Sequence, residues 1–309
     1  MRVVFFGTPA FAVPSLLALV GEGFEVAAVV TRPDQPQGRS RSTLVPSPVK
    51  AAAIAESLPV LQPERPKDPA FAAALSALAP DVGVVVAYGH ILTPALLAVP
   101  RRGMINVHPS LLPELRGAAP VEWAILNGLE KTGVTIMQME AGLDSGPVLH
   151  QIPHLIPADL TGGELSLHLA EIGAQALVET LAMLAADGLR PVPQHHERAT
   201  YAPKITRDTG RIRWDGGAAQ VRRTILALDP KPGAWTTLDG LEVKLFGAVP
   251  LPGGAVGPPG AVVGADRELV IAASDANLVI AEVQPAGKAR MPAADWIRGR
   301  GVRAGQRLA

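Results

Sequence analysis

An amide and an imidazole occur two residues apart in the stretch RGMINVHPSLLPELRGAAP, residues 102–120. Asn106 and His108 alternate with apolar residues at the end of an expected strand. Their side chains therefore point to one face, about 7 Å apart along the chain. An amide can donate to a developing oxyanion, and an imidazole can move a proton or stabilise that charge. The pair favours acyl transfer, although polar residues at a strand end also satisfy the backbone of an ordinary loop.

A carboxylate occurs in a second loop, residues 140–147, which reads EAGLDSGP and follows another expected strand. Two glycines and a proline constrain this loop, which suits a carboxylate that must hold an imidazole in one orientation. Asp144 is the candidate for that role. A glycine-rich loop with an aspartate is also typical of a hairpin, and spacing leaves both interpretations open.

Several other chemistries are disfavoured by what the sequence lacks. With no cysteine there is no disulfide, thiolate metal ligand or cysteine nucleophile, which fits a reducing cytosol. The first strand–turn–helix reads GTPAFA, with one glycine where a dinucleotide fingerprint needs three, and neither a P-loop nor a G-x-S-x-G motif occurs. The seven histidines form no convincing metal-binding pattern. The sequence predicts no metal and no nucleotide cofactor.

The elements that must position these residues alternate between strand and helix in the first half of the chain. This alternation predicts an α/β fold over residues 1–188, a doubly wound, Rossmann-like, mostly parallel sheet. Ligands bind such sheets at the carboxyl ends of the strands, where Asn106 and His108 are expected. The expected strands are residues 3–6, 25–30, 81–87, 102–108 and 132–139, and the expected helices are 10–20, 48–57 and 164–186.

The pattern changes after a proline-containing segment, residues 189–205, which we interpret as a linker. Residues 206–309 contain one helical run, 218–228, and about five short strand-like runs, which predict a smaller β-barrel of the oligonucleotide-binding (OB-like) kind. Residues 1–189 hold 11 Lys and Arg against 17 Asp and Glu, a net charge of −6. Residues 190–309 hold 17 against 11, a net charge of +6, which favours a nucleic-acid partner over a merely basic surface.

A membrane location is disfavoured at the N-terminus. Residues 3–21 carry no charge, but Gly7, Pro9 and Pro14 interrupt the apolar run. A hydrophobic content of 48% with 18% charged residues is ample for a folded core. We expect a cytoplasmic protein without membrane association, and the segregated charge favours a monomer.

The sequence resembles the folate-dependent formyltransferases at the residues already singled out. Asn106-Val107-His108-Pro109-Ser110-Leu111-Leu112-Pro113, then Arg116-Gly117, then Gly142-Leu143-Asp144-Ser145-Gly146, are similar to the family's signature. The stretches VVFFGTPAFAVPSL, VVVAYGHIL and TGVTIMQM support the resemblance, which extends through both expected domains. Within the family, the chain is similar to members that formylate charged initiator tRNA.

The resemblance implies a formyl donor, 10-formyltetrahydrofolate, and an acceptor, the α-amino group of methionyl initiator tRNA. It implies a catalytic trio of Asn106, His108 and Asp144. It also implies a pterin pocket formed largely by backbone groups of residues 86–92 and 138–144, and a basic tRNA-contacting loop over residues 34–46. The implied folate-binding residues are Ser110, Leu111, Leu112, Pro113, Val86, Tyr88, Gly89 and Ile91, and the implied tRNA-binding residues are Arg39, Arg41 and Lys204.

Two positions depart from the tRNA-specific pattern. Pro109 stands where many such members have glycine or alanine, and residues 229–235 lack the usual tryptophan between two prolines. An amino-sugar nucleotide or glycinamide ribonucleotide is therefore an alternative acceptor. The second domain argues against the single-domain purine enzymes, and Arg39, Arg41 and the basic half favour RNA. A folate hydrolase would release formate without any acceptor, and a non-catalytic nucleic-acid-binding protein is disfavoured by the intact trio.

Overall fold

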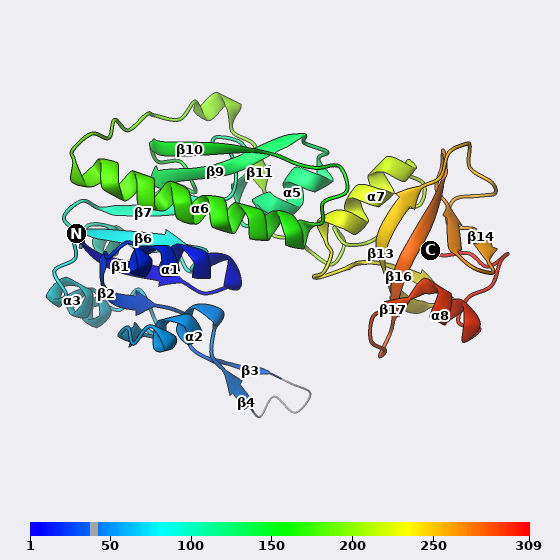
Figure 1. Ribbon diagram of the computed structural model, residues 1–309, viewed down its shortest axis with the longest axis horizontal. Helices are drawn as coiled ribbons and strands as arrows, with labels where there is room; N and C mark the ends of the chain where they lie inside the picture. The colour runs from blue at the N-terminus through cyan, green and yellow to red at the C-terminus, as the bar shows by residue number, and fades with distance from the viewer. Residues whose placement is uncertain (38–42) are drawn as a thin grey trace. The chain divides into compact units, whose positions relative to one another are not determined.

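The computed structural model describes residues 1–37 and 43–309 and divides into two compact units (Figure 1). The first unit comprises Met1–Pro120, Lys131–Leu155 and Ser166–Ala202. The second comprises Val121–Glu130, Ile156–Leu165 and Pro203–Ala309. Arg39 and Arg41, which the sequence predicts to contact tRNA, fall outside the described residues.

A seven-stranded sheet in the order β10-β9-β7-β6-β1-β2-β5 forms the centre of the first unit. The strands from β7 to β5 in this order are parallel, whereas β9 pairs antiparallel with β7 and β10 pairs antiparallel with β9. The predicted mostly parallel sheet is therefore confirmed. The strands are β1 (Arg2–Gly7), β2 (Glu25–Val30), β5 (Val60–Leu61), β6 (Val82–Val86), β7 (Met104–His108), β9 (Lys131–Gln138) and β10 (Val148–Leu155).

Helices cover both faces of this sheet. Phe71 of α3 and Leu96 of α4 are buried in one cluster with Phe6, Val85 and Met104. On the opposite face lies α6 (Figure 1), where an added Cβ at Gly173 would come within 2.9 Å of Val107. The helices are α1 (Val13–Gly21), α2 (Pro48–Ala55), α3 (Pro69–Ala77), α4 (Pro94–Leu97) and α6 (Gly162–Ala185).

Helix α6 has the length and apolar composition that could cross a membrane, and it is the one such helix in the described part of the chain. Its leucines at positions 165, 169, 177 and 181 are fully buried in the protein. Burial of that apolar stripe is typical of a core helix.

Short local signals begin several helices of the first unit. The side chains of Ser47, Asp68 and Thr93 each accept a hydrogen bond from a backbone N–H in the first turn of α2, α3 and α4. A proline follows each cap within the first helical turn, where its missing N–H costs nothing. Two further short pairs complete the unit, β3 (Gln35–Gln37) with β4 (Thr43–Val45) and β8 (Arg116–Gly117) with β11 (Tyr201–Ala202).

The second unit contains a six-stranded antiparallel sheet in the order β12-β13-β16-β15-β14, with β17 paired to β16. Near the C-terminus, Leu308 forms a bridge with Leu238 of β12, and Arg307 forms one with Ala261 just before β14. The last residues therefore contact both edges of the sheet. The elements are α5 (Pro120–Leu126), α7 (Ala218–Ala227), β12 (Ala234–Leu238), β13 (Leu241–Pro250), β14 (Val262–Ala265), β15 (Leu269–Ala272), β16 (Asn277–Pro285), β17 (Met291–Pro292) and α8 (Ala293–Arg298).

Candidate active site

The strand order of the first unit reverses between β1 and β6, and open α/β sheets bind their ligands at the carboxyl ends of the strands at such a point. The chain passes from β1 to β2 on one side and later returns to β6 on the other, which makes this a topological switch point. The hydroxyl of Thr8, after β1, donates to the carbonyl of Tyr88, after β6, at 3.0 Å. Because β7 lies beside β6, Asn106 and His108 reach the same edge of the sheet.

Asn106 offers a hydrogen-bonding amide at this edge. Its neighbour Val107 packs toward α6, so alternation along β7 places Asn106 and His108 on the opposite face. The Asn106 side chain is half-buried, and its amide makes no hydrogen bond to any residue that the structure describes. The amide is therefore free to donate to a ligand.

His108 is held in one orientation by a backbone carbonyl. The ring is 4% exposed, and its Nε2 lies 2.9 Å from the carbonyl oxygen of Leu115. A carbonyl only accepts, so Nε2 carries a proton and Nδ1 is the nitrogen left for chemistry. Nδ1 lies 3.8 Å from Oδ2 of Asp144, which is longer than a direct hydrogen bond.

Asp144 lies at the top of a tightly closed loop between β9 and β10. The N–H of Gln138 donates to the carbonyl of Pro147 at 2.9 Å and closes the loop at its base. A Cβ on Gly146 would come within 1.9 Å of the Gln138 carbonyl oxygen, so this position requires glycine. Asp144 has φ +46°, and its Oδ2 accepts a hydrogen bond of 2.8 Å from the N–H of Gly117. The fold thus brings together His108, at the end of β7, and Asp144, in the loop between β9 and β10.

The predicted folate-binding turn, residues 110–113, is organised by a threonine that sequence reasoning missed. Thr135 of β9 is fully buried, and its hydroxyl donates to the Ser110 carbonyl at 2.7 Å. The same oxygen accepts from the Leu112 N–H at 3.1 Å and from Gln151 Nε2 at 2.9 Å. Ser110 is itself fully buried and donates its hydroxyl to the Glu114 carbonyl. One hydroxyl therefore satisfies three polar groups beneath the turn.

We predict that Thr135→Val lowers the free energy of unfolding by about 2–3 kcal/mol, because it leaves buried polar groups unsatisfied. Urea denaturation followed by circular dichroism measures this change. Thr132→Val in the same strand is the matched control, since the buried Thr132 hydroxyl has no hydrogen-bond partner among the described residues. The control is expected to be neutral or stabilising, and equal losses in the two variants would contradict the assignment.

The predicted pterin loop follows β6, which ends at Val86. The backbone N–H groups of residues 88–92 donate to no other residue in the described part of the chain. Gly89 has φ +83°, and Ile91 is 82% exposed. Free backbone donors beside an exposed apolar side chain fit a flat heterocycle with acceptor atoms.

Tyr88 contributes its backbone rather than its hydroxyl to this loop. The ring is buried against Phe6 in an edge-on contact, with the ring centroids 5.5 Å apart. Burial raises the pKa of the Tyr88 phenol to about 12, and the hydroxyl has no hydrogen-bond partner within the described residues. The phenol is therefore neutral at physiological pH.

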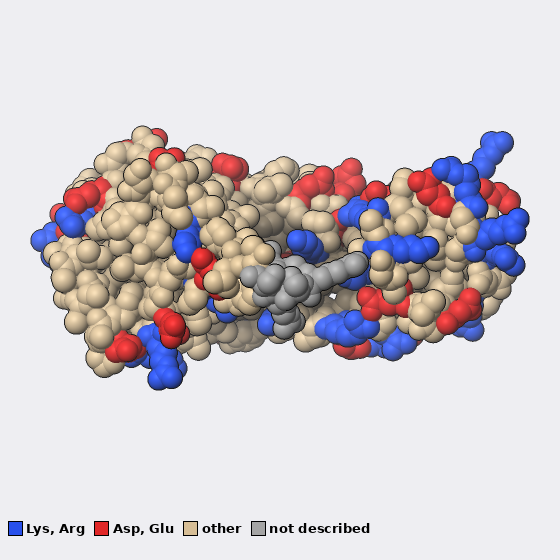
Figure 2. Space-filling view, turned by 90° about the horizontal axis from the view of Figure 1, so that it is seen from below, with Lys and Arg blue, Asp and Glu red and all other residues tan. Residues whose placement is uncertain are grey.

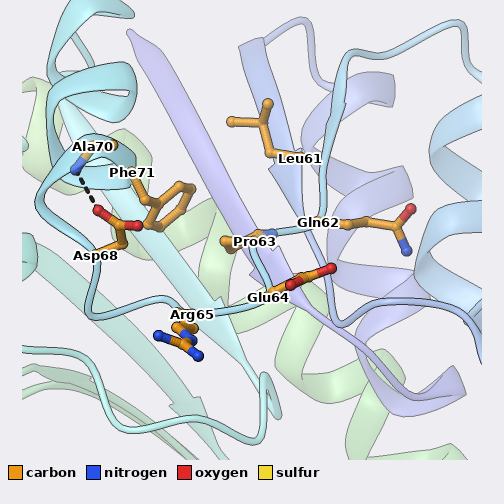
Figure 3. A pocket seen from close by; sticks show the side chains of 8 residues that line it. All are labelled: Leu61, Gln62, Pro63, Glu64, Arg65, Asp68, Ala70 and Phe71. Carbon is orange, nitrogen blue, oxygen red and sulfur yellow. Dashed lines mark hydrogen bonds between the residues drawn. The ribbon is translucent and has the colours of Figure 1, made fainter.

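A separate surface pocket of about 450 Å³ lies at the end of β5 and the start of α3 (Figure 3). It is lined by Leu61 and Phe71 together with charged side chains such as Arg65 and Asp68. The Asp68 carboxylate accepts a hydrogen bond from the Ala70 N–H at 2.9 Å and caps α3 (Figure 3). None of the residues predicted for catalysis or folate binding lines this pocket, and Asp68 is already used as a helix cap.

The remaining histidines take part in local contacts. His150 pairs with Glu179 at 2.9 Å, and the His154 ring packs edge-on against His168. Over residues 1–37 and 43–309, no group of three or more His, Cys, Asp or Glu side chains is placed to hold a metal ion.

Comparison with known proteins identifies the family. The sequence profile described as formyl transferase matches residues 1–181, and the formyl transferase C-terminal domain profile matches residues 204–301. The chain belongs to the formyl transferase family. The predicted resemblance to folate-dependent formyltransferases is confirmed, and the protein is a formyl-transferring enzyme.

The chain is similar over its full length to proteins named methionyl-tRNA formyltransferase. The methionyl-tRNA formyltransferase of Roseiflexus sp. (strain RS-1) is 46% identical over 310 aligned residues, covering 100% of this chain and 95% of the relative. That of Thermobifida fusca (strain YX) is 47% identical, covering 100% of this chain and 99% of the relative.

Solved structures share the formyl transferase fold at low sequence identity. HypX from Aquifex aeolicus in complex with tetrahydrofolic acid matches with a TM-score of 0.69 at 19% identity, over 96% of this chain and 46% of HypX. The N-formyltransferase from Helicobacter canadensis, in complex with folinic acid and dTDP-3-aminofucose, matches with a TM-score of 0.69 at 16% identity, over 92% of this chain and 99% of that one.

Two further residues at the site were given no role from the sequence. Arg116 appears in the RGAAP stretch, and Gln194 appears among prolines and histidines in the expected linker. Gln194 hydrogen-bonds both Arg116 and the Asp144 loop. Spacing along the chain gives no hint of this, because Gln194 and Asp144 are separated by 50 residues.

Proposed function

We propose that this protein transfers the formyl group of 10-formyltetrahydrofolate to the α-amino group of methionyl initiator tRNA, producing N-formylmethionyl-tRNA for translation initiation. The observation that carries the proposal is the site itself. His108 Nδ1 faces the Asp144 carboxylate at 3.8 Å, beside the free amide of Asn106, at the carboxyl edge of the sheet. Relatives at 46–47% identity that are named methionyl-tRNA formyltransferase support the acceptor.

The three side chains divide the chemistry of transfer between two nitrogens. Bound 10-formyltetrahydrofolate supplies an activated formyl group. Asn106 donates its amide N–H to the formyl oxygen as the amine attacks and that oxygen gains negative charge. His108, protonated at Nδ1, stabilises the same charge, while its Nε2–H stays on the Leu115 carbonyl.

Asp144 completes the proton balance of the reaction. A neutral amine attacks the formyl carbon, one proton must leave that nitrogen, and one must reach the departing folate nitrogen as its bond to carbon breaks. The Leu115 carbonyl holds His108, and the Asp144 carboxylate, 3.8 Å from Nδ1, helps relay these protons. Positioning of both reactants at one edge supplies the rest of the rate enhancement.

Folate is held by two segments in this proposal. Ser110, Leu111, Leu112 and Pro113 form one side, with Ser110 and Leu112 fixed through Thr135. Val86, Tyr88, Gly89 and Ile91 form the other, where free N–H groups meet the pterin. The complex of HypX with tetrahydrofolic acid, which shares this fold, supports a folate in such a site.

The second unit binds the tRNA in this proposal. We propose that its antiparallel sheet belongs to a small OB-like barrel, which is supported by the C-terminal residues that bridge Leu238 and Ala261. Lys and Arg side chains gather over this unit on the face shown in Figure 2. Lys204, which is exposed at the start of the unit, contacts phosphate together with Arg39 and Arg41.

The domain organisation follows from these roles. Residues 1–188 supply the reacting groups, residues 206–309 bind RNA, and residues 189–205 connect them. We propose that the enzyme acts as a monomer in the cytoplasm, where translation initiation takes place.

The deciding experiment measures transfer of labelled formyl from 10-formyltetrahydrofolate to charged initiator tRNA, with elongator methionyl-tRNA and free methionine as parallel acceptors. The proposal expects rapid labelling of the initiator alone. Labelling of an amino-sugar nucleotide or glycinamide ribonucleotide in place of tRNA would be consistent with formyl transfer but would contradict tRNA as the acceptor. Release of formate without any acceptor would identify a hydrolase.

A further inference from the structure

We propose that Gln194 is a positioning residue for catalysis, which fixes the loop carrying Asp144 to the buried guanidinium of Arg116. This inference rests on the proposed catalytic role of Asp144. Gln194 comes from the segment that the sequence identifies as a linker, yet it belongs to the same compact unit as the catalytic trio.

The side-chain amide of Gln194 hydrogen-bonds through both its nitrogen and its oxygen, to the Asp144 loop and to Arg116. The side chain is 7% exposed, and its Nε2 donates to the Asp144 carbonyl at 2.9 Å and to the Gly146 carbonyl at 2.7 Å. Its Oε1 accepts from Arg116 Nε at 3.1 Å and Nη2 at 2.6 Å. Two carbonyls are therefore held from one end of the amide and a guanidinium from the other.

The partners require an amide at this position. Carbonyl oxygens only accept and a guanidinium only donates, so the Gln194 nitrogen must face the loop and its oxygen must face Arg116. A carboxylate would still accept hydrogen bonds from Arg116, but it could not donate to the two carbonyl oxygens and would repel them. An apolar side chain would satisfy neither group.

Arg116 is an unusual anchor because it is buried without a carboxylate. The residue is 4% exposed, and no carboxylate oxygen in the described ranges lies within 4.0 Å of it. Its other hydrogen bond joins Nη2 to His196 Nδ1 at 3.1 Å. A buried charge that depends on neutral partners requires them in well-defined positions, so Gln194 is held firmly.

The hydrogen bonds of Gln194 act on Asp144 together with a hydrogen bond from Gly117, the residue that follows Arg116. The N–H of Gly117 donates to Asp144 Oδ2 at 2.8 Å, while Gln194 holds the Asp144 backbone carbonyl at 2.9 Å. The carboxylate and the main chain of Asp144 are thus fixed from adjacent anchors. Together these two contacts orient the Asp144 carboxylate toward His108.

The segment that carries Gln194 is fixed independently on either side of it. Val192 and Val148 exchange two backbone hydrogen bonds of 2.8 Å. Beyond Gln194, the Thr200 hydroxyl accepts from the Leu115 N–H at 2.9 Å, and β11 pairs with β8. Substitution of Gln194 therefore removes its hydrogen bonds to the Asp144 loop, while these other contacts still hold the segment in place.

The test is a double-mutant cycle between Gln194→Glu and Asp144→Asn, read out as kcat and KM for formyl transfer to methionyl-tRNA. In the wild-type background Gln194→Glu is expected to lower kcat about 10–100-fold, because small displacements of a catalytic group cost rates of this order. KM for both substrates should change less than about threefold, since binding contacts are untouched. In the Asp144→Asn background the same substitution should lower kcat by less than about twofold.

The outcomes separate this inference from the proposed function. An equal loss of kcat from Gln194→Glu in both backgrounds would show a general structural role and overturn the inference alone. Wild-type turnover in Asp144→Asn would remove the proposed role of Asp144 and the inference with it. Gln194→Met, which is uncharged and of similar length, repeats the cycle if the glutamate variant does not fold. Gln175→Glu on the exposed surface of α6 controls for the added charge and should retain turnover within about twofold.

Discussion

Asn106→Ala is expected to lower kcat by about 10²–10³, the usual cost of losing one oxyanion donor. The half-buried Asn106 amide makes no hydrogen bond to any described residue, so its removal leaves no protein group unsatisfied. Stability should therefore change little, and the loss should appear in the chemical step. Single-turnover transfer of labelled formyl, with thermal denaturation of the same preparation, measures both quantities.

The control for this substitution is Asn127→Ala, which truncates an exposed asparagine outside the catalytic edge. Its turnover is expected to match the wild type. A folded Asn106→Ala enzyme with wild-type turnover would remove Asn106 from the mechanism. A rise in KM alone, with kcat preserved, would assign the amide to substrate binding instead.

His108→Gln is expected to lower kcat by about 10²–10⁴, the range that general acid–base groups contribute. Glutamine carries an amide that can still donate to the Leu115 carbonyl, which accepts from His108 Nε2 at 2.9 Å in the native protein. It supplies no ionisable nitrogen toward Asp144. The substitution therefore separates the anchoring bond from the reactive Nδ1.

Two comparisons establish whether His108 and Asp144 act as a unit. The double variant His108→Gln with Asp144→Asn should be little slower than the worse single variant, because residues of one catalytic unit are strongly non-additive. His195→Gln, at an exposed histidine paired with Glu197, should retain wild-type turnover. Multiplication of the two single losses in the double variant would indicate that the residues act separately.

The sheet and the shared face of Asn106 and His108 could be predicted because their signals are local. Runs such as VGVVV are apolar at every position, as strands covered on both faces must be. Alternation along residues 104–108 is enough to place Asn106 and His108 on one face. The long helix expected at residues 164–186 is observed at Gly162–Ala185.

The parts that could not be predicted depend on pairings between distant segments. Nothing near Thr135 indicates that its hydroxyl will lie beneath residues 110–112, since the contact exists only once β9 pairs with β7. The antiparallel direction of β9 is likewise set by its partner rather than by its own residues. Gln194 lies among prolines, a composition typical of connections, and its role follows from carbonyl positions that sequence patterns do not encode.

The pairing of β11 with β8 determines where the chain can be cut. A fragment ending at residue 188 retains Asn106, His108 and Asp144 but loses Gln194, Thr200 and the strand partner of Arg116–Gly117. In that fragment the main chain around Leu115, whose carbonyl orients His108, would lose the segment that pairs with it. A fragment ending at Ala202 keeps all of these contacts. A fragment that preserves the contacts around His108 and Asp144 therefore includes most of the segment that looks like a spacer.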